Sequence, residues 1–406
     1  MDKALPNRTL RAGLYFFAAT CLLSITLSEA AILLMAAAVA WKTLASPQGF
    51  RQTASELNRN PLVFPLTVYL VSYIFSSIFS LDPHLSFSRL STELMKVLAA
   101  LVLFHAVSNA SRQKAVYWFL SGAAAAGLMG VWQLASPLLR SSGTSIVRAY
   151  GVMHAVSYGE VMAMAAVMAI LASTAAEGRP RRLLQALLAC IFAGFCASLS
   201  RGPALGLILS LGIIFVLTRE TRKTVIVLFS VLLLAFAATA AQNKASRERV
   251  MDMKKDYTVN VRFSMWHSGL HIFKDYPLTG TGPYALRRVF NYYHHQPVDN
   301  KIDFQDVHDL YLQHLAESGL PGLFALLLLL YALLRSPAKS FMRHRDVYSA
   351  WGLAALAGFL AMMITDSSFD LPLTAFFVYF IAAVSGNAGR PEDPGGATPA
   401  GSSMRP

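Results

Sequence analysis

Stretches of apolar residues alternate with short polar connectors along most of this chain. A run of about 20 apolar residues is long enough to cross the hydrocarbon core of a bilayer as a helix, which bonds its backbone polar groups internally. The pattern predicts about twelve such spans, at roughly 12–28, 30–46, 62–81, 93–108, 115–136, 157–174, 183–199, 203–218, 223–242, 319–335, 348–366 and 370–386. The expected fold is therefore an all-α polytopic membrane protein.

The composition agrees with this fold class. Hydrophobic residues make up 55% of the 406 residues and charged residues only 14%, whereas soluble domains carry about 25% charged residues. A soluble chain this apolar would expose large aggregation-prone patches. The basic residues before the first apolar run resemble a signal peptide, but no clear small-residue cleavage site follows, so we expect a retained first helix.

The distribution of Lys and Arg predicts the orientation of the spans. If the N-terminus is cytoplasmic, the inside segments and the two tails hold 20 of the 35 Lys and Arg residues, and the short outside connectors hold very few. This bias is the positive-inside pattern, and it fits an even number of spans with both termini cytoplasmic. The net charge of +13 then follows mostly from topology, which argues against nucleic-acid binding, since the inside charges are scattered over short loops.

One connector is much longer than the others. It covers 243–318 and divides the chain into 1–242 with about nine spans, the connector, 319–386 with about three spans, and a Gly-, Pro- and Ser-rich tail at 387–406 that we expect to be disordered. Apolar residues at helical spacing within NVRFSMWHSGLHIFKDYP predict a helix that stops near Pro277, and HDLYLQHLAESGLPG predicts a second that runs straight into the next span. Loops of this length in compact proteins are usually functional.

Cationic residues gather on the predicted outer side. Arg201 follows a tight turn between two apolar spans, and a lone Arg at the membrane edge normally faces a cavity or a partner. Arg89, Glu93 and Lys96 share one face of a predicted helix, and a nearby segment supplies Arg148 together with His154 and Glu160. The simplest ligand for such a cluster is an anion at the interface, such as a lipid phosphate or pyrophosphate.

Two stretches of the long connector carry a family resemblance. The segments RFSMWHSGLHIFKDYPLTGTGPYAL and DVHDLYLQHLAESGLPGL resemble the signature of the O-antigen ligase and Wzy-type polymerase family of membrane glycosyltransferases. The matching positions are Arg262, Trp266, Gly269, Phe273, Pro277, Leu278, Gly280 and Gly282, then His308, Leu312, Leu315, Glu317, Gly319, Leu320 and Gly322. Two further motifs of the family match Ser200-Arg201-Gly202 and Ser80, Asp82, Pro83 and Ser86. Asp309 is a departure, because the family usually has Asn there.

The resemblance implies a GT-C-like fold with one large periplasmic loop that contains helices, in the bacterial inner membrane. It also implies transfer of a glycan from undecaprenyl pyrophosphate to an acceptor on the periplasmic side. In that reaction His308 would take the proton of the acceptor hydroxyl, Arg201 and Arg262 would bind the pyrophosphate, and Arg89 and Lys96 would assist. Asp309, Glu317 and Trp266 would support the site, and we expect direct displacement with inversion at the anomeric carbon.

Each of these residues also has a purely structural interpretation. Arg201 could cap a helix or anchor at headgroups, and Arg262 could be a solvated surface residue. Glu317 could orient or cap the tenth span, and Trp266 could stack on a sugar or sit at the membrane interface. GTGP at 280–283 is better explained as a turn than as a phosphate loop, because no G-K-[ST] follows.

The sequence predicts no cofactor and no metal, since neither a D-x-D pair nor a His/Cys ligand cluster stands out in the connector. The expected partners are an undecaprenyl-pyrophosphate-linked glycan, a lipid A-core acceptor and membrane lipids. An O-antigen ligase is the first interpretation, and a Wzy-type polymerase or a protein O-oligosaccharyltransferase is the second. A transporter is disfavoured, because the spans are nearly free of charge and the charged residues cluster at the outer edge.

Overall fold

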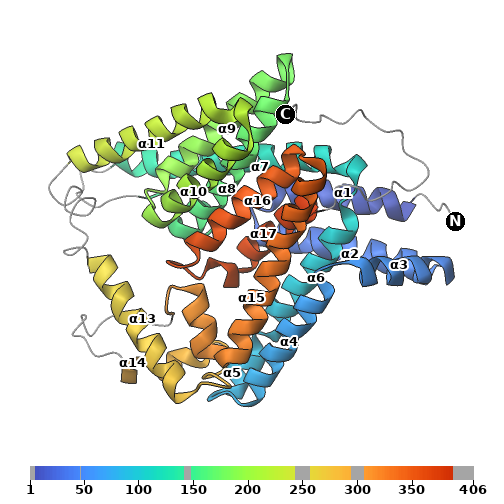
Figure 1. The fold of residues 1–406 in the computed structure, drawn as a ribbon, viewed down its shortest axis with the longest axis vertical. Helices are drawn as coiled ribbons and strands as arrows, with labels where there is room; N and C mark the ends of the chain where they lie inside the picture. The colour runs from blue at the N-terminus through green and yellow to red at the C-terminus, as the bar shows by residue number, and fades with distance from the viewer. Residues whose placement is uncertain (1–4, 46, 141–147, 243–256, 294–305, 387–406) are drawn as a thin grey trace.

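The computed structural model describes residues 5–45, 47–140, 148–242, 257–293 and 306–386, and every regular element within them is helical (Figure 1). The α-helices are α1 (Leu5–Thr20), α2 (Ile25–Leu44), α3 (Pro47–Arg59), α4 (Val63–Ile78), α5 (Pro83–Ser88), α6 (Leu90–Ala106), α7 (Asn109–Arg140), α8 (Ala155–Ala175), α9 (Gly178–Ala197), α10 (Arg201–Leu217), α11 (Arg222–Gln242), α13 (Tyr257–Asp275), α14 (Phe290–Tyr293), α15 (Leu310–His344), α16 (Val347–Met362) and α17 (Pro372–Gly386). Short 3-10 helices are η1 (Arg219–Thr221), η2 (Ala285–Arg288) and η3 (Ser368–Asp370).

Each of the twelve expected apolar runs overlaps one of these helices, so the polytopic all-α class is confirmed, but the count of twelve spans is not. By length and composition five described helices can cross a membrane, namely α2, α7, α8, α9 and α15, and a sixth span results if α3 and α4, bent by 78°, count as one. Helices α10, α16 and α17 are apolar but have only 15–17 residues. At 1.5 Å per residue they reach about 22–26 Å, which is less than the roughly 30 Å hydrocarbon core.

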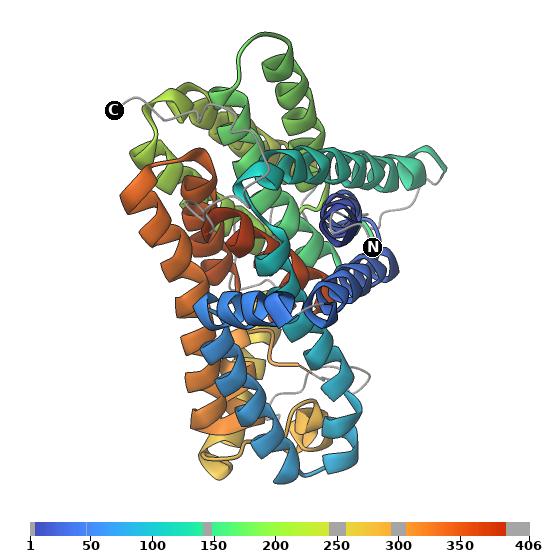
Figure 2. The same cartoon turned by 90° about the vertical axis from the view of Figure 1, so that its right-hand side faces the viewer.

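Helix α8 lies at the centre of the bundle and is buried along most of its length. It packs against α9, α10 and α16 (Figures 1 and 2). Small residues let these helices approach closely: a Cβ at Gly358 of α16 would lie 2.6 Å from the carbonyl oxygen of Gly206 in α10. Such small-residue contacts are the usual way in which membrane helices pack.

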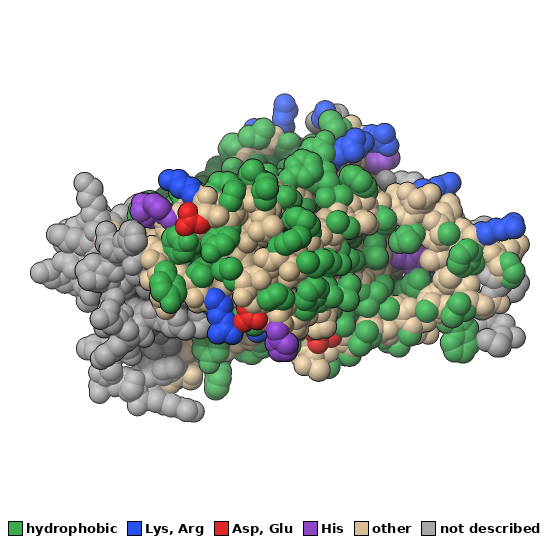
Figure 3. Space-filling model, turned by 90° about the horizontal axis from the view of Figure 1, so that it is seen from below, with side chains coloured by type: hydrophobic (Ala, Val, Ile, Leu, Met, Phe, Trp, Pro, Cys, Tyr) green, Lys and Arg blue, Asp and Glu red, His purple; other side chains and the backbone are tan. Residues whose placement is uncertain are grey.

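Large apolar side chains cover much of the outer surface. On α4 alone, Phe64, Val71 and Ile78 are 68%, 61% and 57% exposed. Hydrophobic side chains are also spread over the face seen in Figure 3, with few charges among them. Exposed apolar area on this scale suits contact with lipid and would be a liability in water.

The helix expected in the long connector is confirmed as α13, which ends at Asp275, two residues before Pro277. Together with η2 and α14 it forms a second, smaller apolar core that packs against α15 (Figure 1). Its buried members are Met265, Ile272, Leu286, Phe290, Val307 and Ala316. Residues 243–256 and 294–305 of the connector lie outside the described residues, and so does the tail at 387–406.

Helix α15 joins the end of the connector to the tenth expected span, but it does not run straight. Gly319 has φ 63° and ψ −164°, which breaks the helix into 310–318 and 320–344. Only glycine adopts this conformation without steric cost, and Pro321 suits the first turn of the second piece because it lacks an N–H. The break therefore falls at the residue where the sequence predicted the span to begin.

Candidate active site

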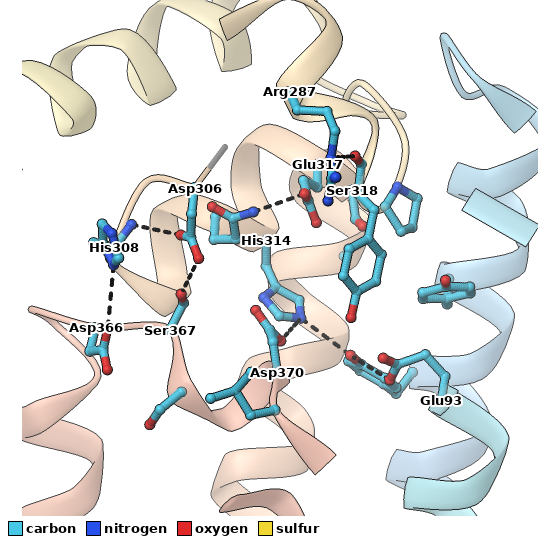
Figure 4. A pocket seen from close by; sticks show the side chains of 18 of the residues that line it. Glu93, Arg287, Asp306, His308, His314, Glu317, Ser318, Asp366, Ser367 and Asp370 are labelled. Carbon is cyan, nitrogen blue, oxygen red and sulfur yellow. Dashed lines mark hydrogen bonds and ion pairs between the residues drawn. The ribbon is translucent and has the colours of Figure 1, made fainter. Parts of the chain in front are cut away.

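A polar pocket of about 290 Å³ opens at the end of the bundle where α4, α6, the connector and the turn after α16 meet (Figure 4). The residues lining it include Tyr69, Ser72, Tyr73, Glu93, His154, Ser157, Tyr284, Arg287, Asp306, His308, Gln313, His314, Glu317, Ser318, Asp366, Ser367, Ser368 and Asp370. Most of them come from segments that the predicted topology places on one side of the membrane, whereas Tyr69, Ser72 and Tyr73 come from within α4.

One wall of the pocket is a tight loop, 277–284, held in the break of α15. The backbone N–H groups of Thr281 and Gly282 donate to the carbonyl oxygens of Ala316 and Glu317, at 3.0 and 2.9 Å. Leu320 in turn donates to the Pro277 carbonyl at 2.9 Å. With these donors engaged, the GTGP segment is a structural turn and not a phosphate loop, as the sequence analysis favoured.

The Ser80–Ser86 motif locks this loop from the opposite side. Ser86 donates to the Pro283 carbonyl at 2.7 Å, and Ser80 donates to that of Thr281 at 3.2 Å. Asp82 caps α5 through the Leu85 N–H and pairs with Arg288 at 2.7 Å. Three motifs that are far apart in sequence thus meet at one point and shape the pocket wall.

His308 stands at the mouth of the pocket in a strained backbone conformation. Its φ is +53°, in the left-handed region that a non-glycine residue adopts only at a cost. Its backbone N–H donates to Asp306 at 2.8 Å, and its Nδ1 lies 3.4 Å from Asp366 Oδ1. The hydrogen bond with Asp366 raises the pKa of His308 above its usual value, against the lowering effect of burial. The side chain keeps 39% of its surface exposed, so substrate can reach it.

Asp306 and Asp366 are the partners of His308 that sequence reasoning missed. Ser367 donates to Asp306 at 2.8 Å, and the N–H of Leu310 donates to the Asp366 carbonyl at 3.1 Å, so the turn after α16 is clamped to the end of the connector. The available signal was a pair of acidic residues, Asp366 and Asp370, in the short segment ITDSSFD.

Arg201 begins α10, beside the same turn but not in the pocket lining. A Cβ at its neighbour Gly202 would lie 2.8 Å from Thr365 Oγ1, so the small residue lets the two turns touch. The Ser198–Ser200 turn before it is fastened by Arg148, whose guanidinium donates to Ser198 O at 3.0 Å and to Ser200 Oγ at 2.5 Å. Arg201 is therefore fixed within the cluster of outer turns.

Arg262 lies half-buried on α13 and acts on the pocket through its charge. Its positive charge opposes the rise in the pKa of His308 that the Asp366 hydrogen bond causes. It also adds to the lowering of the pKa of His154, which is mainly due to burial. Arg262 is therefore within electrostatic reach of His308 and His154.

The two assisting cations are placed differently. Arg89 is exposed, and its guanidinium lies 5.2 Å from the ring centroid of Tyr284 in a cation–π contact. Lys96 is buried with only 4% of its surface exposed, pairs with Glu93 at 2.6 Å and donates to the Asp370 carbonyl at 3.1 Å. These contacts place Lys96 behind the pocket wall rather than in its lining.

The three supporting residues hold the fold around the pocket. Asp309 caps α15 by accepting the Leu312 N–H at 2.9 Å, and burial raises the pKa of its carboxyl. Glu317 lines the pocket and accepts a hydrogen bond from Gln313 at 2.8 Å. Trp266 packs against the second core and edge-on to the exposed Phe263 ring, and its Nε1 is buried without a hydrogen-bond partner among the described residues.

The lining as a whole is acidic rather than cationic. Five carboxyl groups line the described pocket, those of Glu93, Asp306, Glu317, Asp366 and Asp370, and Arg287 is the only Lys or Arg among the residues that line it. The prediction of a cationic site rested on the number of Lys and Arg residues in the outer segments. Where their side chains lie is instead set by tertiary contacts. Within the described residues, no group of three or more His, Cys, Asp or Glu side chains is arranged to hold a metal ion.

The fold and site define a polytopic α-helical membrane protein with a polar pocket, containing a histidine–carboxylate pair, at one end of its bundle. Residues 186–327 match the family model described as O-antigen ligase, which confirms the resemblance that the motifs carry. The matched stretch includes Arg201, Arg262 and His308, and the family supports the conclusion that the chain is an enzyme. No curated protein matches the chain.

Proposed function

We propose that this protein is an O-antigen ligase that transfers a glycan from undecaprenyl pyrophosphate to lipid A-core, at the periplasmic face of the bacterial inner membrane. The observation that carries the proposal is the pairing of His308 with Asp366 at the mouth of the pocket. A sugar hydroxyl is a weak nucleophile at neutral pH, and a positioned imidazole is suited to take its proton.

In the proposed reaction the acceptor hydroxyl oxygen attacks the anomeric carbon of the donor sugar. The new C–O bond forms as the bond from that carbon to the pyrophosphate oxygen breaks, so the configuration inverts. The hydroxyl proton passes to Nε2 of His308, and undecaprenyl pyrophosphate leaves with the electron pair of the broken bond. Asp366 at Nδ1 then stabilises the imidazolium, as a carboxylate does for a catalytic histidine.

Arg201 and Arg262 are proposed to neutralise the negative charge that develops on the pyrophosphate. An arginine can offer two parallel N–H donors to phosphate oxygens, and preorganised donors of this kind typically contribute about 10²–10³ in rate each. Because the pocket lining is acidic, we propose that the glycan occupies the pocket and that the anionic pyrophosphate binds near these arginines, outside it. Arg89 is proposed as a peripheral contact and Lys96 as a residue that holds Glu93 in place.

The orientation of the protein is part of the proposal. Segments that the Lys and Arg distribution places at the outer side are joined by hydrogen bonds. Ala149 N–H donates to the carbonyl of Ala197, at the outer end of α9, at 3.0 Å, and Leu81 N–H, just after α4, donates to the Thr281 carbonyl at 2.8 Å. These contacts support the proposal that the reaction takes place at one outer face and that both termini are cytoplasmic.

A polymerase or a protein O-oligosaccharyltransferase would use the same donor and the same pair of His308 and Asp366 with another acceptor. The ligase is preferred on the single long connector and the basic charge balance. Purified protein supplied with undecaprenyl-pyrophosphate glycan and lipid A-core should form the linked product. If the glycan is instead extended, or joined to a protein, while lipid A-core stays unmodified, the ligase proposal is wrong.

A further inference from the structure

A second histidine at the pocket has no part in the mechanism proposed above. His154 lies in the turn before α8 and lines the same pocket as His308. The residue is exposed, so a ligand at the pocket can reach its ring. What this imidazole can do is decided by the partner of each of its two nitrogens.

One ring nitrogen of His154 caps a helix. His154 is the N-cap of α8, with φ −68° and ψ 150°, and its Nδ1 accepts the backbone N–H of Val156 at 3.4 Å. A ring nitrogen that accepts a hydrogen bond carries no proton, so the neutral ring has its proton on Nε2. The cap thus fixes the tautomer and makes Nε2 a hydrogen-bond donor.

The surroundings of His154 keep this ring neutral. Its pKa is lowered, mainly because the protein desolvates the partly buried ring, and the positive charges of Arg148 and Arg262 add to that effect. Asp366 acts in the opposite direction without reversing the shift. Protonation would also break the cap, because both ring nitrogens would then be donors. At neutral pH His154 is therefore an uncharged N–H donor, whereas the raised pKa of His308 suits a base.

The groups around His154 favour an anionic ligand. Arg148 acts on it from the preceding turn and Arg262 from α13. The N-terminus of α8, a helix of 21 residues, adds the positive end of its dipole. The carboxylate of Asp366 also acts on His154, but it is already paired with His308.

Ser157 supplies a second polar group at the same helix end. It lies in the first turn of α8, lines the pocket and has only 2% of its surface exposed. Its Oγ forms no hydrogen bond with the described residues, and it is not among the polar atoms that the fold closes off completely. A buried hydroxyl of this kind gains a hydrogen bond when a ligand binds beside it.

We propose that His154, as a neutral Nε2–H donor, binds an oxygen of the donor's pyrophosphate together with Ser157, at the N-terminus of α8. The inference rests on the proposed function, because it assigns both residues to the leaving group of that reaction. His154 keeps its proton and donates a hydrogen bond to a phosphate oxygen, while His308 takes the proton of the acceptor hydroxyl. The pyrophosphate then binds at the rim of the pocket, between these donors and the arginines.

The tautomer is measured first, without substrate. Imidazole nitrogen chemical shifts are recorded by NMR on detergent-purified protein that contains isotope-labelled histidine, and the His154 signals are assigned by their absence in His154→Ser. We expect a protonated Nε2 and an unprotonated Nδ1 at neutral pH. A ring protonated on Nδ1, or on both nitrogens, overturns the proposal.

Binding is then measured with inorganic pyrophosphate as the probe, in a neutral detergent without divalent cations. His154→Ser is the decisive variant, because serine is a good N-cap and so keeps the capping while the ring donor is lost. Its Kd should rise about tenfold or more, the usual effect of losing a hydrogen bond to a charged group. A merely structural role predicts the wild-type Kd in His154→Ser and weaker binding only in His154→Ala.

His84→Ser is the matched control, since His84 is an exposed histidine of α5 on the same predicted outer side and does not line the pocket. Its Kd should equal that of the wild type. Ser157→Ala should raise the Kd about three- to tenfold, and an unchanged Kd contradicts the part of Ser157. No binding by the wild type, an unchanged Kd in His154→Ser, or an equal rise in His84→Ser overturns the proposal.

Failure of this inference and failure of the proposed function give different results. If the wild type binds pyrophosphate through His154 but transfers no glycan, the anion site stands and the proposed reaction falls. If glycan is transferred while His154→Ser keeps the wild-type Kd and rate, the reaction stands and the anion site falls.

Discussion

His308 and Asp366 lie 58 residues apart in sequence, yet Nδ1 of the imidazole is 3.4 Å from Oδ1 of the carboxylate. His308 precedes α15 and Asp366 follows α16, so the packing of these two helices sets the distance between them. The contact leaves Nε2 as the nitrogen that can take up a proton. The proposed base thus depends on a partner that no local motif reveals.

The pH dependence of transfer should report this pair. His308 must be neutral to act as a base, and its pKa is raised by the Asp366 hydrogen bond, so the rate should rise with pH as His308 loses its proton. Asp366→Asn removes the carboxylate that raises the pKa of His308. The acid limb should therefore move to lower pH, while the maximal rate falls. The measurement is the pH profile of kcat/KM.

His308→Ala sets the reference for that experiment. Loss of a general base typically costs about 10²–10⁴ in rate, and membrane insertion should remain intact. A near-normal rate in His308→Ala, or an acid limb that stays in place in Asp366→Asn, would contradict the assignment.

Arg201 and Arg262 should each be needed for turnover but not for folding. Arg201→Ala and Arg262→Ala should each lower the rate by about 10²-fold or more, and the lysine variants should recover only part of it, because lysine cannot offer two parallel donors. Arg343→Ala is the control, since Arg343 is exposed in the last turn of α15. Full activity in Arg262→Ala would remove that residue from the site.

Gly282 should be essential for the pocket wall. It has φ +97°, and a Cβ there would lie 1.9 Å from Ser80 Oγ, so Gly282→Ala combines backbone strain with a clash and should cost about 2–5 kcal/mol. Gly178→Ala is the matched control, because Gly178 has φ +62° and no atom within 4 Å of its Cβ position. It should cost only about 1 kcal/mol. Thermal unfolding in detergent gives both values, and equal losses would show that the contact with Ser80 is unimportant.

The Glu93–Lys96 pair should behave as a buried ion pair. Lys96→Met leaves Glu93 uncompensated and should lower the free energy of unfolding by about 3–5 kcal/mol, whereas Glu93→Gln with Lys96→Met should cost less than the sum of the two single changes. A double-mutant cycle in thermal stability measures this coupling. If Lys96→Met keeps its stability and instead raises KM for the lipid donor, Lys96 contacts the pyrophosphate after all.

Chelation should leave transfer unchanged. The sequence of the connector offers neither a D-x-D pair nor a His/Cys cluster, and the proposed arginines supply the positive charge that a metal would otherwise provide. Turnover of purified enzyme in EDTA should therefore equal that in buffer. A loss of activity that Mg²⁺ or Mn²⁺ restores would show that the leaving group is bound through a metal.

The sequence determined the helices and part of the site. Each apolar run corresponds to a helix because hydropathy is a local property, and the ends of α13 and of the first piece of α15 follow from Pro277 and Gly319, whose backbone preferences are also local. His308, Arg201 and Arg262 could be named because their motifs are contiguous in sequence. The number of spans could not be predicted in the same way, since apolar character alone does not separate a full crossing from a shorter helix buried by its neighbours.

Tertiary structure alone decided which partners these residues have. Asp366 reaches His308 and Lys96 reaches the Asp370 carbonyl, because helices distant in sequence pack at particular angles and heights. The acidic character of the pocket has the same origin, since side-chain direction is not encoded in the number of charges per segment. The sequence thus predicted which groups react and on which side of the membrane they lie, while packing set the geometry around them.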